Sequence, residues 1–143
     1  MNLEDSSMTL LRGHFAMTLV CAGSASVGEI EAALAPMVDG SLTVNVRPIA
    51  DEPAHPPVAE SYLITVHGSD RLGIVARLAG VVADSGGNIT DLTTRLAGDL
   101  YVLVAEVDVP VGTDAAALNA QVRQAAELLG VDVTWRAVER DEL

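Results

Sequence analysis

Apolar residues in the second half of the chain recur with two different periods, and each period predicts one kind of element. Two segments repeat apolar residues at helical spacing, from Gly73 to Ser85 and between Asp114 and Gly130. Four further segments are rich in β-branched residues or alternate between apolar and polar positions, as strands do. These predicted strands are residues 62–67, 89–96, 100–109 and 131–138.

The predicted elements follow one another in the order β-α-β-β-α-β. This order is typical of the split βαβ or ferredoxin-like arrangement, an α+β fold. Asp70 is the best candidate to cap the first of the two helices, and Thr113 or Asp114 can cap the second.

The first half of the chain repeats part of this order. Asn2, Asp5 and Leu10 match Asn88, Asp91 and Leu96, each 86 positions later. The segment that begins at Ser26 and continues to Glu29 reads as a capping box that opens a helix. Residues 42–47 match residues 131–136, which predicts a strand. Shared element order therefore indicates an internal repeat with the order ββαβ in its first copy.

The repeat is incomplete, because the first copy has no counterpart of residues 61–86. It lacks a first strand and a first helix, which would leave an apolar strand edge open. Three explanations compete: a start placed about 26 residues late, a trimmed chain, or cover by a second chain or by the second repeat. We expect the late start.

A proline-rich joint separates the two copies. Four of the six prolines fall between positions 48 and 57, and proline excludes both a helix interior and a central strand. The sequence therefore predicts an incomplete unit over residues 1–50, a linker over 51–60 and a complete unit over 61–143.

Composition narrows the classes of partner. The 143 residues carry a formal net charge of -12, and all eight basic residues are isolated arginines, so we expect no direct binding to nucleic acid. No apolar run reaches the ~20 residues of a membrane span, and no secretory signal is visible at the N-terminus. A cytoplasmic protein without membrane contact is the expectation.

Side chains typical of catalysis or metal binding are scattered. His14, His55 and His67 lack the spacing of metal ligands, and no serine has a histidine or aspartate placed to activate it. We therefore predict no catalytic residues, no metal and no cofactor.

The densest chemistry lies between Val66 and Val75, where a strand runs through a glycine-containing turn into a helix. The free backbone N–H groups of a first helical turn favour an anion, and the carboxylate of an amino acid suits them. Asp70 could take the ammonium group of the same molecule. The alternative is that Asp70 only caps the helix and that Gly73 only permits close packing.

Residues 70–75 (Asp-Arg-Leu-Gly-Ile-Val), followed by Gly86-Gly-Asn-Ile89 and Asp91, resemble the ACT domain. That family usually has an Asp/Asn-Arg-Pro-Gly turn after its first strand and a Gly-x-Asn-Ile/Leu segment that opens the second. Leu72 departs from the family's proline. Two such units in a short chain look most like proteins similar to the glycine cleavage system transcriptional repressor.

The resemblance implies a non-enzymatic regulatory protein that binds a small amino acid, such as glycine, at an interface between units. A homodimer is implied, with output through a protein partner that is a regulator or a metabolic enzyme, and a role in transcription regulation of amino-acid metabolism. Asn2, which matches Asn88, could serve the partner half of a site. The implied ligand-binding residues are Asp70, Arg71, Leu72, Gly73, Ile74, Asn88 and Ile89.

Two other functions stay open at this point. The chain could be a structural module that forms dimers without a ligand, because a ferredoxin-like sheet leaves one face for pairing. It could also be the regulatory fragment of a folate-related hydrolase such as a formyltetrahydrofolate hydrolase, although residues 61–143 leave no room for a catalytic domain.

Overall fold

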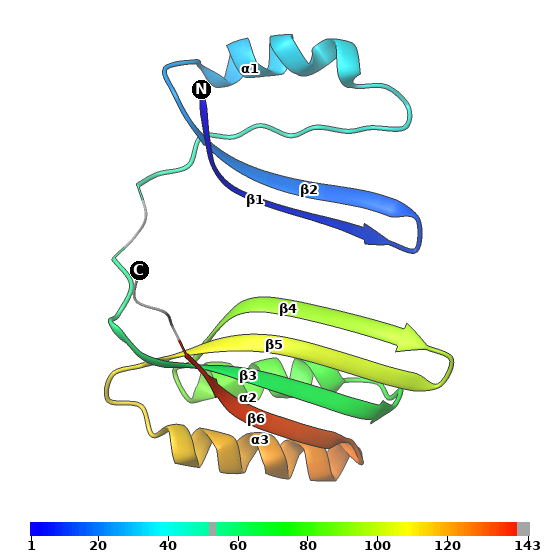
Figure 1. Ribbon diagram of the computed structural model, residues 1–143, viewed down its shortest axis with the longest axis vertical. Helices are drawn as coiled ribbons and strands as arrows, with labels where there is room; N and C mark the ends of the chain where they lie inside the picture. Colours follow the sequence, from blue (N-terminus) through cyan, green and yellow to red (C-terminus); the bar gives the residue numbers. More distant parts are fainter. Residues whose placement is uncertain (52–53, 140–143) are drawn as a thin grey trace. The chain divides into compact units, whose positions relative to one another are not determined.

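A computed structural model describes residues 1–51 and 54–139 of the chain (Figure 1). Two compact units are present, Met1–Pro53 and Ala54–Leu143. Each unit has its own sheet, so the two are described separately. Residues 52–53 of the predicted linker lie outside the described residues.

The second unit contains one antiparallel sheet of four strands in the order β4-β5-β3-β6. Both helices lie on the same face of this sheet (Figure 1). The chain order and the strand order confirm the predicted ferredoxin-like α+β fold. Its elements are β3 (Val58–Ser69), α2 (Ile74–Asp84), β4 (Asn88–Ala97), β5 (Leu100–Pro110), α3 (Ala115–Leu129) and β6 (Asp132–Val138).

The strand β3 begins earlier than the sequence predicts. Val58 already pairs with Pro110, and Glu60 pairs with Val109, inside the range assigned to the linker. Pro56 and Pro57 lie just before Val58, the first paired residue of β3, which agrees with the exclusion of proline from central strands.

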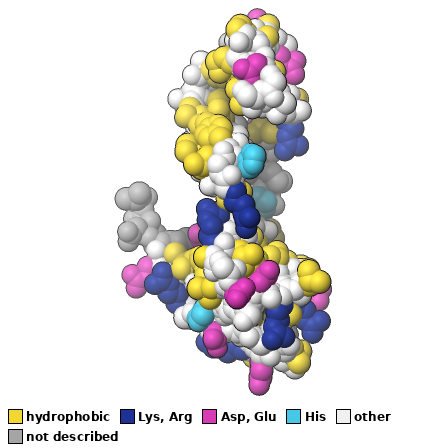
Figure 2. Space-filling model, turned by 90° about the vertical axis from the view of Figure 1, so that its right-hand side faces the viewer, with side chains coloured by type: hydrophobic (Ala, Val, Ile, Leu, Met, Phe, Trp, Pro, Cys, Tyr) yellow, Lys and Arg dark blue, Asp and Glu magenta, His cyan; other side chains and the backbone are white. Residues whose placement is uncertain are grey.

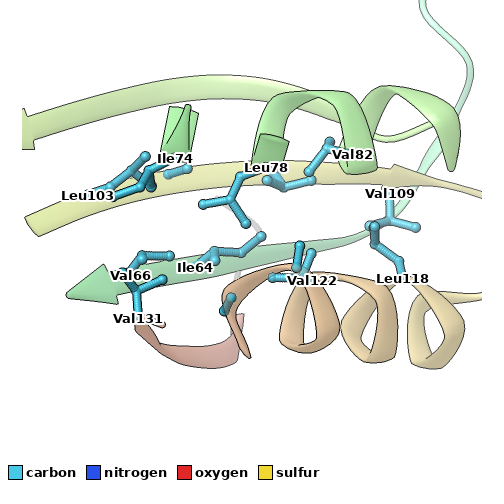
Figure 3. Close-up of a cluster of buried hydrophobic side chains, with 14 residues drawn as sticks. Ile64, Val66, Ile74, Leu78, Val82, Leu103, Val109, Leu118, Val122 and Val131 are labelled. Carbon is cyan, nitrogen blue, oxygen red and sulfur yellow. The ribbon is translucent and has the colours of Figure 1, made fainter. Parts of the chain in front are cut away.

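An aliphatic core lies between the sheet and the two helices (Figure 3). Alternate residues of β3 and β5, such as Ile64 and Leu103, point into it, and Leu78 and Val122 enter from the helices. Burial of each such side chain contributes roughly 1.5–3 kcal/mol. Because only 3% of the chain is aromatic, this core depends on branched aliphatic residues.

Helix α3 has the ends that the sequence predicts. The Asp114 carboxylate accepts a hydrogen bond from the Ala117 N–H at 3.0 Å, and Gly130 ends the helix at a φ of 68°. The predicted helix between Gly73 and Ser85 is confirmed as α2, but the predicted cap was wrong, because the N-cap is Gly73 and no side chain caps it. Asp70 lies four residues before the helix begins, too far from the first turn to cap it, and its N–H donates to the Asp99 carbonyl.

The first unit contains the hairpin β1 (Asn2–Leu11) and β2 (His14–Ala22), the helix α1 (Val27–Leu34) and the short 3-10 helix η1 (Ala35–Met37). The predicted capping box is confirmed: the Ser26 N–H donates to Glu29 Oε2 at 2.7 Å, and the Glu29 N–H donates to Ser26 Oγ at 3.2 Å. The bond that the Ser26 N–H donates to the carboxylate, followed by the Ser26 side chain, holds the pKa of Glu29 below its ordinary value.

The two hairpins share an irregularity at the same place. The pairing of β1 with β2 shifts between Leu3 and Asp5, and the pairing of β4 with β5 shifts between Ile89 and Asp91. These positions are again 86 residues apart. A bulge is a specific backbone feature, so its repetition is a stronger sign of a shared architecture than the sparse sequence matches.

The predicted strand over residues 42–47 is not formed. In the second unit the matching segment, β6, pairs with β3. The described residues of the first unit contain no counterpart of β3, so residues 42–47 lack the neighbour that would complete a ladder. The described part of the first unit therefore has the element order ββα and lacks the predicted final strand.

Candidate ligand-binding site

The candidate site is the turn between β3 and α2. The strand ends at Ser69, and the turn residues Asp70 and Gly73 are exposed. Leu72, which stands where the family has proline, is fully exposed. Ile74 differs from these, since only 2% of it is exposed and it belongs to the core. Any contact of Ile74 with a ligand would therefore use its backbone.

The start of α2 offers backbone donors without acceptors. Gly73 has a φ of 88°, a left-handed conformation that glycine adopts without a steric cost. No side chain accepts a hydrogen bond at this cap. The first N–H groups of the helix, from Ile74 onward, have no acceptor within the helix and carry the positive end of its dipole. This geometry suits a carboxylate.

Arg71 lies near a different helix end. A Cβ placed on Gly130 would come within 3.4 Å of Arg71 Nη2, so the guanidinium lies beside the C-terminus of α3. A cation at this position complements the negative end of the helix dipole. Such an interaction typically stabilises a helix by about 0.3–1 kcal/mol. Arg71 thus connects the turn to the end of α3. The sequence did not predict this contact, because the two segments are distant in the chain.

Asn88 and Ile89 lie at the opposite end of the sheet from the turn. Asn88 pairs with Asp108, which faces Ser61 on β3, whereas the turn follows Ser69 on the same strand. Eight strand residues at ~3.3 Å each separate the two ends by about 26 Å. One unit therefore does not bring all the predicted residues together, and a ligand that contacts both groups needs two units.

Asn2 occupies the matching position in the first unit. It opens β1 just as Asn88 opens β4, and both side chains are exposed. No turn equivalent to residues 70–73 exists among the described residues of the first unit, because that unit lacks the strand and helix that would flank it.

The remaining polar candidates do not form a second site. His67 Nε2 lies 3.7 Å from Asp132 Oδ2, across β3 and β6. The described residues contain no group of three side chains placed to hold a metal ion. A surface groove between α2 and α3 is lined by Arg77, Gln121 and their neighbours, and it includes none of the predicted ligand-binding residues.

Comparison with known proteins identifies the second unit. The family model for the ACT domain matches residues 60–136, more than half of the chain. The chain belongs to the ACT-domain family. This ACT-domain protein is also 40% identical to the UPF0237 protein MK1213 of Methanopyrus kandleri, a match that covers 54% of this chain and 94% of the relative.

Solved structures resemble both units of this ACT-domain protein. An unknown protein from Galdieria sulphuraria is 28% identical, with a TM-score of 0.77 over 96% of this chain and 82% of that one. A structure named "putative glycine cleavage system transcriptional repressor" has a TM-score of 0.68, with 97% of this chain and 82% of that chain covered. At 16% identity the latter shows a shared fold alone. No helix among the described residues is long and apolar enough to cross a membrane.

Proposed function

We propose that this ACT-domain protein is a non-enzymatic regulatory protein that binds a small amino acid at an interface between two ACT-like units. The observation that carries the proposal is the turn at Asp70–Ile74, where the exposed carboxylate of Asp70 precedes the uncapped N–H groups of α2 by four residues. These two features complement the carboxylate and the ammonium group of one zwitterion.

The interface requirement follows from the geometry of the second unit. Asn88 and Ile89 lie about 26 Å from the turn of their own unit. A second unit that runs in the opposite direction would place its own Asn88, or the matching Asn2, beside the turn. Ligand would then stabilise one arrangement of two units over another, which is how binding shifts a population.

The proposed organisation is an incomplete ACT-like unit over residues 1–50, a linker that ends where β3 begins at Val58, and a complete unit from Val58 onward. The bulges at Leu3/Asp5 and Ile89/Asp91 support the repeat. The likeness to the Galdieria sulphuraria protein extends over 96% of the chain and includes both units. A homodimer would supply the second complete turn.

The protein would exert its regulatory effect by binding other proteins. A net charge of -12 opposes contact with the phosphate backbone, so a role in transcription would act on a DNA-binding regulator, and a role in metabolism on an enzyme. Glycine is the first ligand to test, because the repressor named in the structural comparison points to glycine metabolism. The proposed location of the protein is the cytoplasm.

Calorimetric titration of the full chain with glycine, serine, valine, leucine and isoleucine tests the proposal. We expect heat with at least one of them, and we expect Asp70→Asn to weaken that binding by about tenfold or more, because a charge-assisted hydrogen bond contributes about 1.5–3 kcal/mol. Asp84→Asn, at the far end of α2, is the matched control.

Two outcomes would contradict amino-acid sensing at this turn. The first is an absence of heat with every amino acid tested. The second is an equal loss of binding in the Asp70 and Asp84 variants, which would reflect net charge and not a site. A chain that dimerises but binds none of these amino acids would instead favour the structural module.

A further inference from the structure

The face of the second unit's sheet opposite its helices carries an ordered pattern of side chains. In β5, Leu103, Ala105 and Val107 point into the core, so the residues between them point to the other, open face. Cross-strand pairing sorts the open face into rows, each named here by its residue on β3.

Each row runs from β4 through β5 and β3 to β6. The His67 row is Arg95, Val102, His67 and Asp132. The Thr65 row is Thr93, Val104, Thr65 and Thr134. The Leu63 row is Asp91, Glu106, Leu63 and Arg136.

The centre of the open face is apolar or only weakly polar. Leu63, Thr65, Val102 and Val104 occupy the two middle strands and are half-buried. A sheet face that stays in water usually carries polar residues at such central positions. The composition therefore suits a face that another surface covers.

Charges of opposite sign occupy diagonal corners around this centre. The His67 row has Arg95 on the β4 edge and Asp132 on the β6 edge. The Leu63 row has the reverse order, with Asp91 and Glu106 on the β4 side and Arg136 on the β6 edge.

Within one unit the acidic pair is not neutralised. Asp91 lies directly opposite Glu106, and like charges in this position destabilise a strand pair. Arg136 lies two strands from Glu106, which is about 10 Å at the ordinary strand spacing. No ion pair among the described residues joins Asp91 or Glu106 to an arginine.

A two-fold axis that runs parallel to the strands brings opposite charges together. When two copies meet face to face around this axis, β4 of one lies over β6 of the other and each row meets the same row. Arg95 then faces the second copy's Asp132, and Asp91 faces its Arg136. An in-plane axis perpendicular to the strands also opposes unlike charges.

We propose that this open face pairs with the same face of a second copy of the chain, as an isologous two-fold interface. It differs from the ligand interface proposed above, which uses the turn and the start of β4. Four strands at ~4.8 Å and eight residues at ~3.3 Å give about 500 Å² per copy. The total of about 1,000 Å² reaches the lower limit of a specific interface, so the dimer is weak and reversible.

Charge-reversal substitutions in the full chain test this interface, with the dissociation constant of the dimer measured by sedimentation equilibrium. Wild-type chain should form dimers of the 14.8 kDa protomer at about 0.1–1 mM. Arg136→Glu alone, or Asp91→Arg alone, should raise the dissociation constant about tenfold, since each places like charges at two symmetric contacts. An equimolar mixture of these two variants should dimerise as the wild type does, because both contacts then join unlike charges.

Matched controls make the same charge changes on the helix side. Arg77→Glu and Asp84→Arg lie on α2 and should leave dimerisation within twofold of the wild type. Fluorescence of Trp135 checks that every variant is folded.

Three results would overturn the proposal: a wild-type monomer at 1 mM, dimers unaffected by Arg136→Glu, or a mixture that fails to recover. If the first unit of the same chain covered this face instead, the wild-type chain would stay a monomer. Amino-acid binding at Asp70 is measured by the calorimetric titration with its own variants, so the two proposals fail separately.

Discussion

Two glycines of α2 provide a test in which the same chemical change has opposite effects. Gly73 precedes the helix at a φ of 88°, whereas Gly80 lies in the helix interior. An added Cβ meets nothing within 4 Å at either position. Packing is therefore equal at the two sites, and only the backbone conformation distinguishes them.

The magnitudes follow from that difference. Gly80→Ala should stabilise the protein by about 0.5–1 kcal/mol, because alanine loses less conformational entropy in a helix than glycine does. Gly73→Ala forces a left-handed conformation that costs an L-residue about 1–2 kcal/mol. The less flexible unfolded chain offsets about 0.4–1 kcal/mol of this cost. The net effect is a destabilisation of roughly 0.5–1 kcal/mol.

Urea denaturation followed by Trp135 fluorescence measures both effects. Trp135 is the only tryptophan, and its ring lies 4.7 Å from that of Tyr62 in the second unit, so the signal reports the unit that contains α2. The two variants should differ by about 1–2 kcal/mol with an unchanged dependence on urea. In thermal unfolding this is roughly 4–8 °C for each kcal/mol in a domain of this size.

Shifts of the same sign in the two alanine variants would refute this reasoning. Gly73→Asn is a further check, because asparagine tolerates the left-handed region better than alanine. It should lose less stability than Gly73→Ala. A larger loss with asparagine would show that the polar side chain, and not the backbone, determines the effect.

The two helix caps give the remaining predictions. Asp114→Ala should cost about 1 kcal/mol in urea denaturation because the Ala117 N–H loses its acceptor, while Asp114→Asn, which can still accept that bond, should cost much less. In the first unit, the lowered pKa of Glu29 means that the hydrogen bond from the Ser26 N–H to its carboxylate stabilises α1 above the ordinary carboxyl pKa and is lost as the pH falls through the lowered value. The Ser26 amide signal in an NMR titration should follow this transition, which Glu29→Gln removes; a midpoint at or above the ordinary glutamate value would contradict it.

The sequence predicted the features that neighbouring residues determine. The capping box at Ser26 and Glu29 and the glycine that ends α3 at Gly130 each depend on a few adjacent positions. The alternation that marks β5 and the stripe that marks α3 depend on ten to fifteen residues of continuous sequence. These local signals were enough for the fold of the second unit.

Features that depend on distant partners could not be predicted in the same way. Residues 42–47 have the pattern of a strand, yet a strand needs a neighbour to pair with. Asp70 is a good capping residue, but the length of the turn decides where α2 begins. Asn88 belongs to the family motif, and only the strand order shows that it lies at the other end of the sheet from Gly73.

One absent strand accounts for the unusual state of the first unit. In the second unit β3 lies between β5 and β6 and supplies Ile64 and Val66 to the core. The described residues 1–51 contain no equivalent strand, and none of them is buried. Phe15 and Met17 are about half exposed, and Figure 2 shows hydrophobic side chains gathered on the surface of this unit. Because none of residues 1–51 is buried, the described part of the first unit has no core, and a strand between β2 and residues 42–47 would supply the central element that β3 supplies in the second unit.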